Sequence, residues 1–165
     1  MMRVWRGQYL EMHVSGTWEY AARIGATGAA VILAVTPEGE IVLVEQYRHA
    51  FGAPCIELPA GLIGDTSDDD TGEAAARREL EEETGFTAET FEDLGTYATS
   101  PGMSSELFTL FRAHGLKRVG AGGGVAGEDI TPHVVPMAEL PGFLDGQRQQ
   151  GRIIDSRLTI ALGLA

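Results

Sequence analysis

The chain has 165 residues, of which 44% are hydrophobic, and its formal net charge at pH 7 is -12. This length and composition are sufficient for one hydrophobic core and predict a single domain over 1–165. The charge excludes a general binder of nucleic-acid backbones, because most of the surface would repel phosphate. It does not exclude a small anionic ligand that a divalent cation bridges to the protein.

The single cysteine, Cys55, excludes an internal disulfide and a cysteine-cluster zinc site, and it is consistent with a reducing cytoplasm. Within the apolar stretch PCIELPAG we expect it to be a buried small hydrophobe rather than a nucleophile. The start MMRVWRGQYLEMHV lacks the apolar region of a signal peptide. The longest apolar run, AAVILAV, is too short to cross a bilayer. We therefore expect a soluble cytoplasmic protein with no membrane partner.

The N-terminal part of the chain is predicted to be rich in strands. Loose alternation of apolar and polar residues over 1–27 predicts one or two strands. The two apolar runs of 28–52 flank the turn sequence TPEGE and predict a hairpin. The stretch CIELPAGLIG predicts one further short strand that breaks at Pro59 and Gly61.

An acidic loop, DTSDDD, is followed by strong helix formers, and we predict a helix at about 71–84. Asp70 is the expected N-cap and Glu73, three residues later, completes a capping box. Gly85 is placed to end the helix.

The C-terminal part is predicted to mix strands and helices around a glycine-rich segment that is mobile or shaped by a ligand. Strand-rich stretches with one charged central helix and terminal helices indicate a mixed α/β or α+β domain. The predicted order is strands at 87–99 and 106–116, the glycine-rich segment at 117–131, a last strand at 133–137, and helices at 138–152 and 155–165.

Three glutamates of the central helix, Glu79, Glu82 and Glu83, lie at positions i, i+3 and i+4 and therefore share one helical face. Like charges at these spacings destabilise a helix by roughly 0.2–0.5 kcal/mol per pair. A solvated face is the ordinary interpretation of such a charge run. The scarcity of basic partners and the neighbouring backbone of PAG favour a second interpretation, in which hard oxygen ligands bind Mg²⁺ or Mn²⁺.

The segment GLIGDTSDDDTGEAAARRELEEETGF resembles the Nudix box, G-x5-E-x7-R-E-U-x-E-E-x-G-U, where U is apolar. The second half, RELEEETGF, matches at every specified position. In the first half, Asp70 stands where the family usually has glutamate, and Gly61 lies three residues further away than the pattern allows. We interpret this as a three-residue insertion within a box at 61–86, with Gly64 as the alternative first glycine.

Other motifs are similar to the ADP-ribose (ADP-sugar) pyrophosphatase branch of that family, namely TWEYAARI, EQYRHAFGAPCIELPAGLI and SPGMSSE. The resemblance implies an α/β/α sandwich with a mixed sheet. It also implies Mg²⁺-dependent hydrolysis of ADP-ribose to AMP and ribose 5-phosphate, and a homodimer whose second subunit contacts the strands of 1–27. Another nucleoside diphosphate sugar such as GDP-mannose, and a Nudix-like regulator without catalysis, remain open.

The resemblance also implies roles for individual residues. The metal ligands are Glu79, Glu82 and Glu83 with the backbone carbonyl of Ala60, and Arg78 holds a ligand carboxylate in place. Glu82 and Arg78 thereby belong to the catalytic set.

A general base and substrate contacts complete the expected site. Glu128 is the expected base, with Asp129 as the alternative, because a flexible loop can bring a carboxylate to the attacking water. Trp18 is expected to stack on the nucleobase, and Trp5 more weakly so. Further substrate contacts are expected from Arg23, Arg48, Glu57, Gly102 and Glu106.

Overall fold

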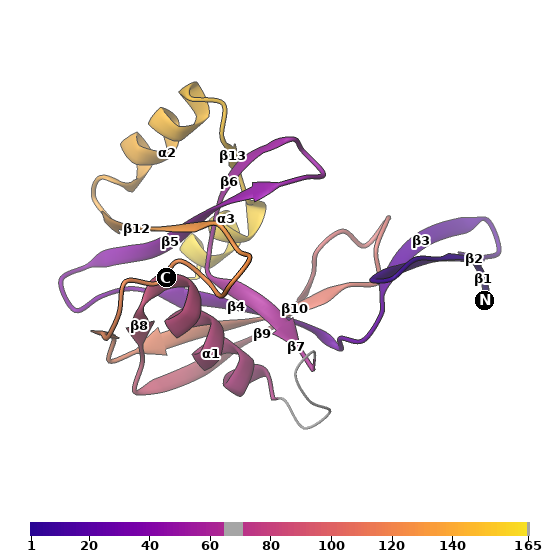
Figure 1. The fold of residues 1–165 in the computed structure, drawn as a ribbon, viewed down its shortest axis with the longest axis horizontal. Helices are drawn as coiled ribbons and strands as arrows, with labels where there is room; N and C mark the ends of the chain where they lie inside the picture. Colours follow the sequence, from indigo (N-terminus) through magenta and orange to yellow (C-terminus); the bar gives the residue numbers. More distant parts are fainter. Residues whose placement is uncertain (65–70, 165) are drawn as a thin grey trace.

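The computed structural model describes residues 1–64 and 71–164 (Figure 1). Over these residues the chain forms two four-stranded mixed sheets, one three-stranded sheet, one two-stranded ladder and three helices. The helices are α1 (Gly72–Thr84), α2 (Leu140–Gln149) and α3 (Ser156–Leu162). None of the described helices is both long enough and apolar enough to cross a membrane.

The central sheet has the strand order β7-β4-β10-β9, in which β4 runs parallel to β10 and the outer pairs are antiparallel. Strand β4 is buried on both faces, which explains its continuous apolar run. Val31 and Leu33 face one core, whereas Ala30 and Ile32 face the other. The strands are β4 (Gly28–Ala34), β7 (Ala60–Ile63), β9 (Thr90–Ala98) and β10 (Leu107–His114).

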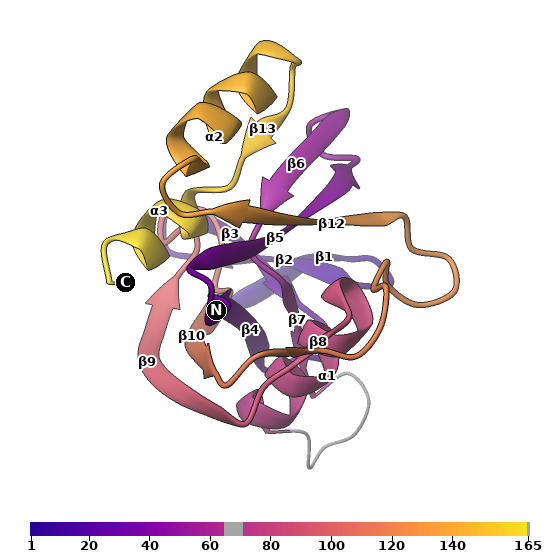
Figure 2. The same cartoon turned by 90° about the vertical axis from the view of Figure 1, so that its left-hand side faces the viewer.

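The second sheet has the order β12-β5-β6-β13 and encloses the first core together with the central sheet, α2 and α3. Helix α1 covers the opposite face of β4 and β10, and Figure 2 shows it on the side away from α2 and α3. The expected α/β/α arrangement is confirmed, although its sheet is divided into two. The strands are β5 (Glu40–Arg48), β6 (Ala53–Glu57), β12 (Ile130–Pro136) and β13 (Ile153–Ile154).

The N-terminal residues form an antiparallel sheet that projects from the body (Figure 1). It has three strands, where the sequence predicted one or two: β1 (Met2–Arg6), β2 (Leu10–Ser15) and β3 (Trp18–Arg23). Backbone hydrogen bonds of Ala21 with Met103 and Ser105 attach β3 to the loop before β10. Several large apolar side chains of this sheet are exposed: Met2, Val4, Trp5, Tyr9, Leu10 and Trp18.

The hairpin predicted for 28–52 was wrong. Its turn forms, since Gly39 N–H donates to the Thr36 carbonyl at 2.9 Å, but β4 and β5 belong to different sheets. The stretch CIELPAGLIG likewise gives two strands, β6 and β7, one in each sheet, and Gly61 lies inside β7 rather than ending a strand. The chain passes between the sheets at Pro59, a residue that has no N–H to donate to a ladder.

Helix α1 begins one residue later than its expected capping box. Thr71 is the N-cap and its hydroxyl accepts from Ala74 N–H at 3.2 Å, so the N-cap predicted at Asp70 was wrong, and Asp70 itself lies outside the described residues. Gly85 ends the helix in the left-handed region, with φ of 73°, as predicted. The chain continues into β8 (Phe86–Thr87), which pairs with β11 (Lys117–Arg118).

Candidate active site

Glu83 is the most deeply buried of the three predicted metal ligands, with 4% of the residue exposed. Its carboxylate accepts hydrogen bonds from Gln46 Nε2 and from Ala60 N–H, each at 3.0 Å. Burial raises the pKa of Glu83 to about 8, and the carboxylates of Glu79 and Glu128 act in the same direction.

Glu79 lies next to both strand β7 and Arg78. Arg78 Nη2 donates to Glu79 Oε1 at 3.1 Å and to the Leu62 carbonyl at 3.3 Å, so this guanidinium contacts a predicted ligand carboxylate. A Cβ atom on Gly61 would overlap the Glu79 carboxyl group. Gly64, with φ of 84°, requires glycine for its backbone conformation, but a Cβ there would not approach the glutamates. The close approach at Gly61 supports its role as the first glycine of the motif.

The oxygen atoms at this face of α1 are suited to bind a divalent cation. They are carboxylate and carbonyl oxygens, the ligands that Mg²⁺ prefers. Glu83 is a buried carboxylate among other carboxylates, and a cation beside it would offset the unfavourable charge that its raised pKa reports. Within 1–64 and 71–164, no three His, Cys, Asp or Glu side chains are already arranged as a metal cluster. The carboxylates of Glu79 and Glu83 instead accept hydrogen bonds from protein side chains. Glu82 is half-buried on the same face of the helix.

The glycine-rich segment is held by the C-terminus of α1. Gly123 N–H donates to the Glu83 carbonyl and Gly124 N–H to the Glu82 carbonyl, both at 2.9 Å. The last carbonyls of a helix have no partner within the helix, so the loop satisfies them. Gly122 has φ of 73°, and a Cβ there would overlap the Thr84 backbone. The expectation of a mobile or ligand-shaped segment was therefore wrong for 119–124.

Glu128 lies just beyond this docked part of the segment. Its Oε2 atom accepts from Val125 N–H at 3.0 Å, and Glu128 N–H donates to the Val125 carbonyl at 3.0 Å. The neighbouring Asp129 is also exposed. The docked loop thus carries the candidate base to the end of α1 at which Glu83 lies.

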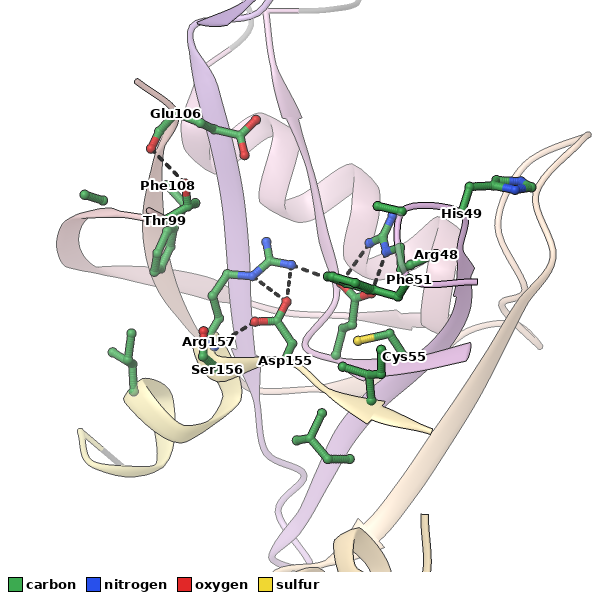
Figure 3. A pocket seen from close by; sticks show the side chains of 16 residues that line it. Arg48, His49, Phe51, Cys55, Thr99, Glu106, Phe108, Asp155, Ser156 and Arg157 are labelled. Carbon is green, nitrogen blue, oxygen red and sulfur yellow. Dashed lines mark hydrogen bonds and ion pairs between the residues drawn. The ribbon is translucent and has the colours of Figure 1, made fainter. Parts of the chain in front are cut away.

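A cavity of about 500 Å³ lies between the β5–β6 connection, β10 and the start of α3 (Figure 3). Three of the predicted substrate residues line it: Arg48, Glu57 and Glu106. Phe51 and Phe108 contribute apolar wall. The cavity therefore combines apolar surface with a few charged groups, as sites for small ligands usually do.

Arg48 and Glu57 form a bidentate ion pair at one side of the cavity. Arg48 Nε lies 2.5 Å from Glu57 Oε1, and Arg48 Nη2 lies 2.8 Å from Glu57 Oε2. These bonds raise the pKa of Arg48, and the charge of Glu83 contributes in the same direction. Arg48 therefore belongs both to the cavity and to the electrostatic environment of the predicted metal ligands.

Arg23 and Glu106 form a second ion pair, with Arg23 Nε 2.6 Å from Glu106 Oε1. Both residues line a smaller cavity of about 150 Å³, and Glu106 also borders the larger one. Gly102 lies exposed in the adjoining turn. Trp18 and Trp5 are more than half exposed on the projecting N-terminal sheet and are not among the residues that line either cavity.

Sequence reasoning missed four residues of this region: Gln46, Phe51, Asp155 and Arg157. Asp155 had a local signal, because an aspartate before a helical run is a typical N-cap, and its carboxylate does accept from Arg157 N–H at 2.7 Å. Gln46 and Arg157 had none, because their contacts with Glu83 and Glu57 span 37 and 100 residues.

The family model described as the NUDIX domain matches residues 26–155. The chain belongs to the Nudix hydrolase family. Divalent metal ions are generally used by Nudix hydrolases, in agreement with the oxygen donors on α1, and the chain is accordingly a Nudix-type enzyme.

Several curated proteins resemble this Nudix hydrolase. A methanol dehydrogenase activator of Bacillus methanolicus is 38% identical over 138 residues, which cover 82% of this chain and 70% of that protein. An ADP-ribose pyrophosphatase of Bacillus subtilis is 40% identical over 54% of this chain and 46% of its own length. A GDP-mannose pyrophosphatase of Cronobacter sakazakii is 37% identical over 82% of this chain and 71% of its own length.

Among solved structures, that of an ADP compounds hydrolase superposes on this Nudix hydrolase with a TM-score of 0.67 and 20% identity. The match covers 87% of this chain and 80% of the other. At this level of identity the similarity is one of fold.

Proposed function

We propose that this Nudix hydrolase cleaves the pyrophosphate bond of ADP-ribose to give AMP and ribose 5-phosphate, with Mg²⁺ as its cofactor and Mn²⁺ as a substitute. One observation carries the proposal: Gln46 of β5 donates to the buried Glu83 carboxylate at 3.0 Å, and Arg48, two residues further along the same strand, lines the cavity. A diphosphate bridging these groups would meet a cation site at one end and a guanidinium at the other. The names of the pyrophosphatase relatives supply the substrate class.

Each residue has a chemical task in this proposal. A bound divalent ion neutralises the diphosphate and acidifies the attacking water. Glu79, Glu82 and Glu83, with the Ala60 carbonyl, would hold the ion.

Three further groups act around the ion. Arg78 keeps the Glu79 carboxylate in place through the 3.1 Å contact. Glu128 accepts the proton of the attacking water, and the docked glycine segment keeps it near α1. Arg48 binds phosphate, because a guanidinium matches phosphate geometry.

The remaining substrate contacts are assigned on the same basis. Glu57, Gly102 and Glu106 lie at or near the cavity and would contact the sugar, and Arg23 would bind phosphate or ribose. Trp18 would stack on the adenine from a second subunit, since it is 65% exposed on a sheet that projects from its own body. The protein is therefore proposed to be a homodimer through that sheet. Sedimentation equilibrium of the full chain and of a Trp5→Ala, Trp18→Ala double variant tests this point.

The substrate is tested with a panel of ADP-ribose, GDP-mannose, UDP-glucose and ADP-glucose in Mg²⁺, read out as released nucleoside monophosphate. We expect the highest kcat/KM with ADP-ribose and no turnover when EDTA replaces Mg²⁺. A panel without any turnover would contradict the proposal as a whole. A preference for another member would contradict only the assignment of the base and sugar.

GDP-mannose is the second candidate substrate, and a specific observation favours it. The GDP-mannose pyrophosphatase relative matches this chain over 143 residues, compared with 89 for the Bacillus subtilis ADP-ribose pyrophosphatase. Adenine remains the first choice because the SPGMSSE loop and TWEYAARI resemble the ADP-ribose branch. The cytoplasmic location stays a prediction.

A further inference from the structure

Arg157, the second residue of α3, lines the 500 Å³ cavity and joins two carboxylates there (Figure 3). Its Nη2 atom lies 3.0 Å from Glu57 Oε2, and the guanidinium also pairs with the Asp155 carboxylate. Glu57 is 2% exposed and therefore depends on protein donors for its charge. Among the described residues it has two basic partners, Arg48 from one strand end and Arg157 from the C-terminal helix.

The backbone fixes Arg157 at this point. Strand β13 pairs in parallel with β6, and Asp155 N–H donates to the Ile56 carbonyl at 3.0 Å, so the start of α3 lies directly beside Glu57. Asp155 then caps α3 through Arg157 N–H and pairs with the same residue's guanidinium. The contact between Arg157 and Glu57 is therefore built from main-chain pairing and not from a flexible surface side chain.

The cluster has two positive and two negative charges, from two arginines and two carboxylates: Arg48, Arg157, Glu57 and Asp155. The pair of Arg48 with Glu57 occupies Nε and Nη2 of Arg48, and its Nη1 has no hydrogen-bond partner within the described chain. Without Arg157, the full charge of Glu57 would act on Arg48, and the Asp155 carboxylate would add a second negative charge nearby. Both changes would make the cavity less attractive to an anion.

We propose that Arg157 is a positioning residue, which shares the Glu57 carboxylate so that Arg48 keeps its orientation and enough positive charge to bind a phosphate of the substrate. Arg157 acts through Glu57 and Arg48 and does not itself contact the reacting atoms. The proposal rests on the pyrophosphatase function proposed above. It adds the C-terminal segment to the residues that determine substrate affinity.

The test compares Arg157→Met with Arg152→Met. Arg152 is a close match, because it lies on the same C-terminal segment, its side chain is 26% exposed against 21% for Arg157, and its Nε atom lies 2.9 Å from Glu45 Oε1. It does not line the cavity. Both changes remove one guanidinium from a glutamate, although the Glu57 side chain is 2% exposed and that of Glu45 is 17% exposed. A purely structural role therefore predicts a loss of stability, larger in Arg157→Met, without a selective change of KM.

We expect Arg157→Met to raise KM for the best substrate of the panel about tenfold, a factor that corresponds to about 1.4 kcal/mol, with little change in kcat. Arg152→Met should leave KM unchanged. Arg157→Lys should recover most of the loss, since it restores the charge. Thermal melts of all variants set an assay temperature at which each is folded, and the lysine variant serves if the methionine variant does not fold.

A second readout is independent of turnover. Binding of inorganic pyrophosphate in EDTA, followed by calorimetry, should weaken in Arg157→Met and not in Arg152→Met. An unchanged KM and an unchanged pyrophosphate affinity in Arg157→Met would overturn the proposal, as would an equal loss in the two variants or a wild type that does not bind pyrophosphate. If no panel member is hydrolysed, the proposed function fails, and the pyrophosphate measurement still decides the role of Arg157.

Discussion

Gly61 lies against the carboxyl group of Glu79 so closely that the two could not coexist in their present positions if residue 61 carried a side chain. Gly61 belongs to β7 and Glu79 to α1, so at this contact the end of a helix side chain lies directly against the strand backbone. The backbone at Gly61 has an ordinary negative φ, and alanine would be tolerated there by the backbone itself.

Gly61→Ala should therefore displace the Glu79 carboxyl group and leave the backbone of the strand unchanged. We expect metal affinity to fall about 10–100-fold, the range found when the support of a metal ligand is disturbed, with only a small loss of stability. Titration of Mg²⁺ against activity measures the effect. Gly142→Ala is the matched control, because a Cβ there meets open space. Wild-type Mg²⁺ dependence in Gly61→Ala would contradict the assignment of Glu79 as a ligand.

Mg²⁺ should raise the melting temperature of the wild type, because an ion that binds only the folded site stabilises it by about 2.7 kcal/mol at 100 times its Kd. Glu83→Gln should lose most of this increase and lower kcat at least about 100-fold by removing a ligand. Without Mg²⁺ its stability should change little at pH 7, since a pKa of about 8 leaves the Glu83 carboxyl mostly protonated and the glutamine amide is neutral as well. Glu81 is an exposed glutamate of the same helix and serves as the control. In scanning calorimetry, the melting temperature of Glu81→Gln should rise with Mg²⁺ as that of the wild type does.

Glu128→Gln should lower kcat by about 10²–10⁴-fold, the range for loss of a general base, while Mg²⁺ binding changes much less. The hydrogen bond from Val125 N–H can be kept by the glutamine carbonyl, so the loop should retain its position. Single-turnover kinetics of Glu128→Gln and Asp129→Asn separate the two candidate bases. A large loss of kcat confined to Asp129→Asn would assign the general base to Asp129. If neither variant loses activity, the base lies elsewhere, and Glu106 is the next residue to test.

Cys55 should be unreactive in the folded protein. The residue is 3% exposed, and burial together with the charges of Glu57 and Asp155 raises the pKa of its thiol to about 12. At pH 8 the reactive thiolate is then on the order of one molecule in 10⁴. We expect no alkylation by iodoacetamide at pH 8 and complete alkylation in guanidinium chloride, as measured by mass spectrometry. Rapid native labelling would mean that the cavity wall at β6 opens.

The parts of the fold that depend on local signals could be predicted from the sequence. The stretch 71–84 carries helix formers and a following glycine; its end at Gly85 agrees with the structure, and its start differs by one residue. The assignment of strands to sheets could not be predicted, because the turn at 36–39 has the same sequence signal whether the flanking strands pair or separate. The strands separate into two sheets because both faces of β4 and of β5 are buried, which is a property of the whole fold.

The site follows the same division. Glu79, Glu82 and Glu83 could be proposed as metal ligands from the sequence because their spacing on one helix is a local property. Arg157 could not be identified, since its contact with Glu57 is formed only when β13 pairs with β6. The docking of Gly123 and Gly124 on α1 was missed for a different reason. Glycine permits both a flexible chain and a close backbone contact, and the sequence does not distinguish the two.

The docking of 119–124 on the end of α1 has a thermodynamic consequence. Glycine loses more conformational entropy than other residues when its backbone becomes fixed. Here that loss occurs once, as the chain folds and the loop amides bind the helix carbonyls. If Glu128 is the base, only the short stretch 125–129 would have to adjust to a substrate, and little of the binding free energy would be consumed in ordering the loop.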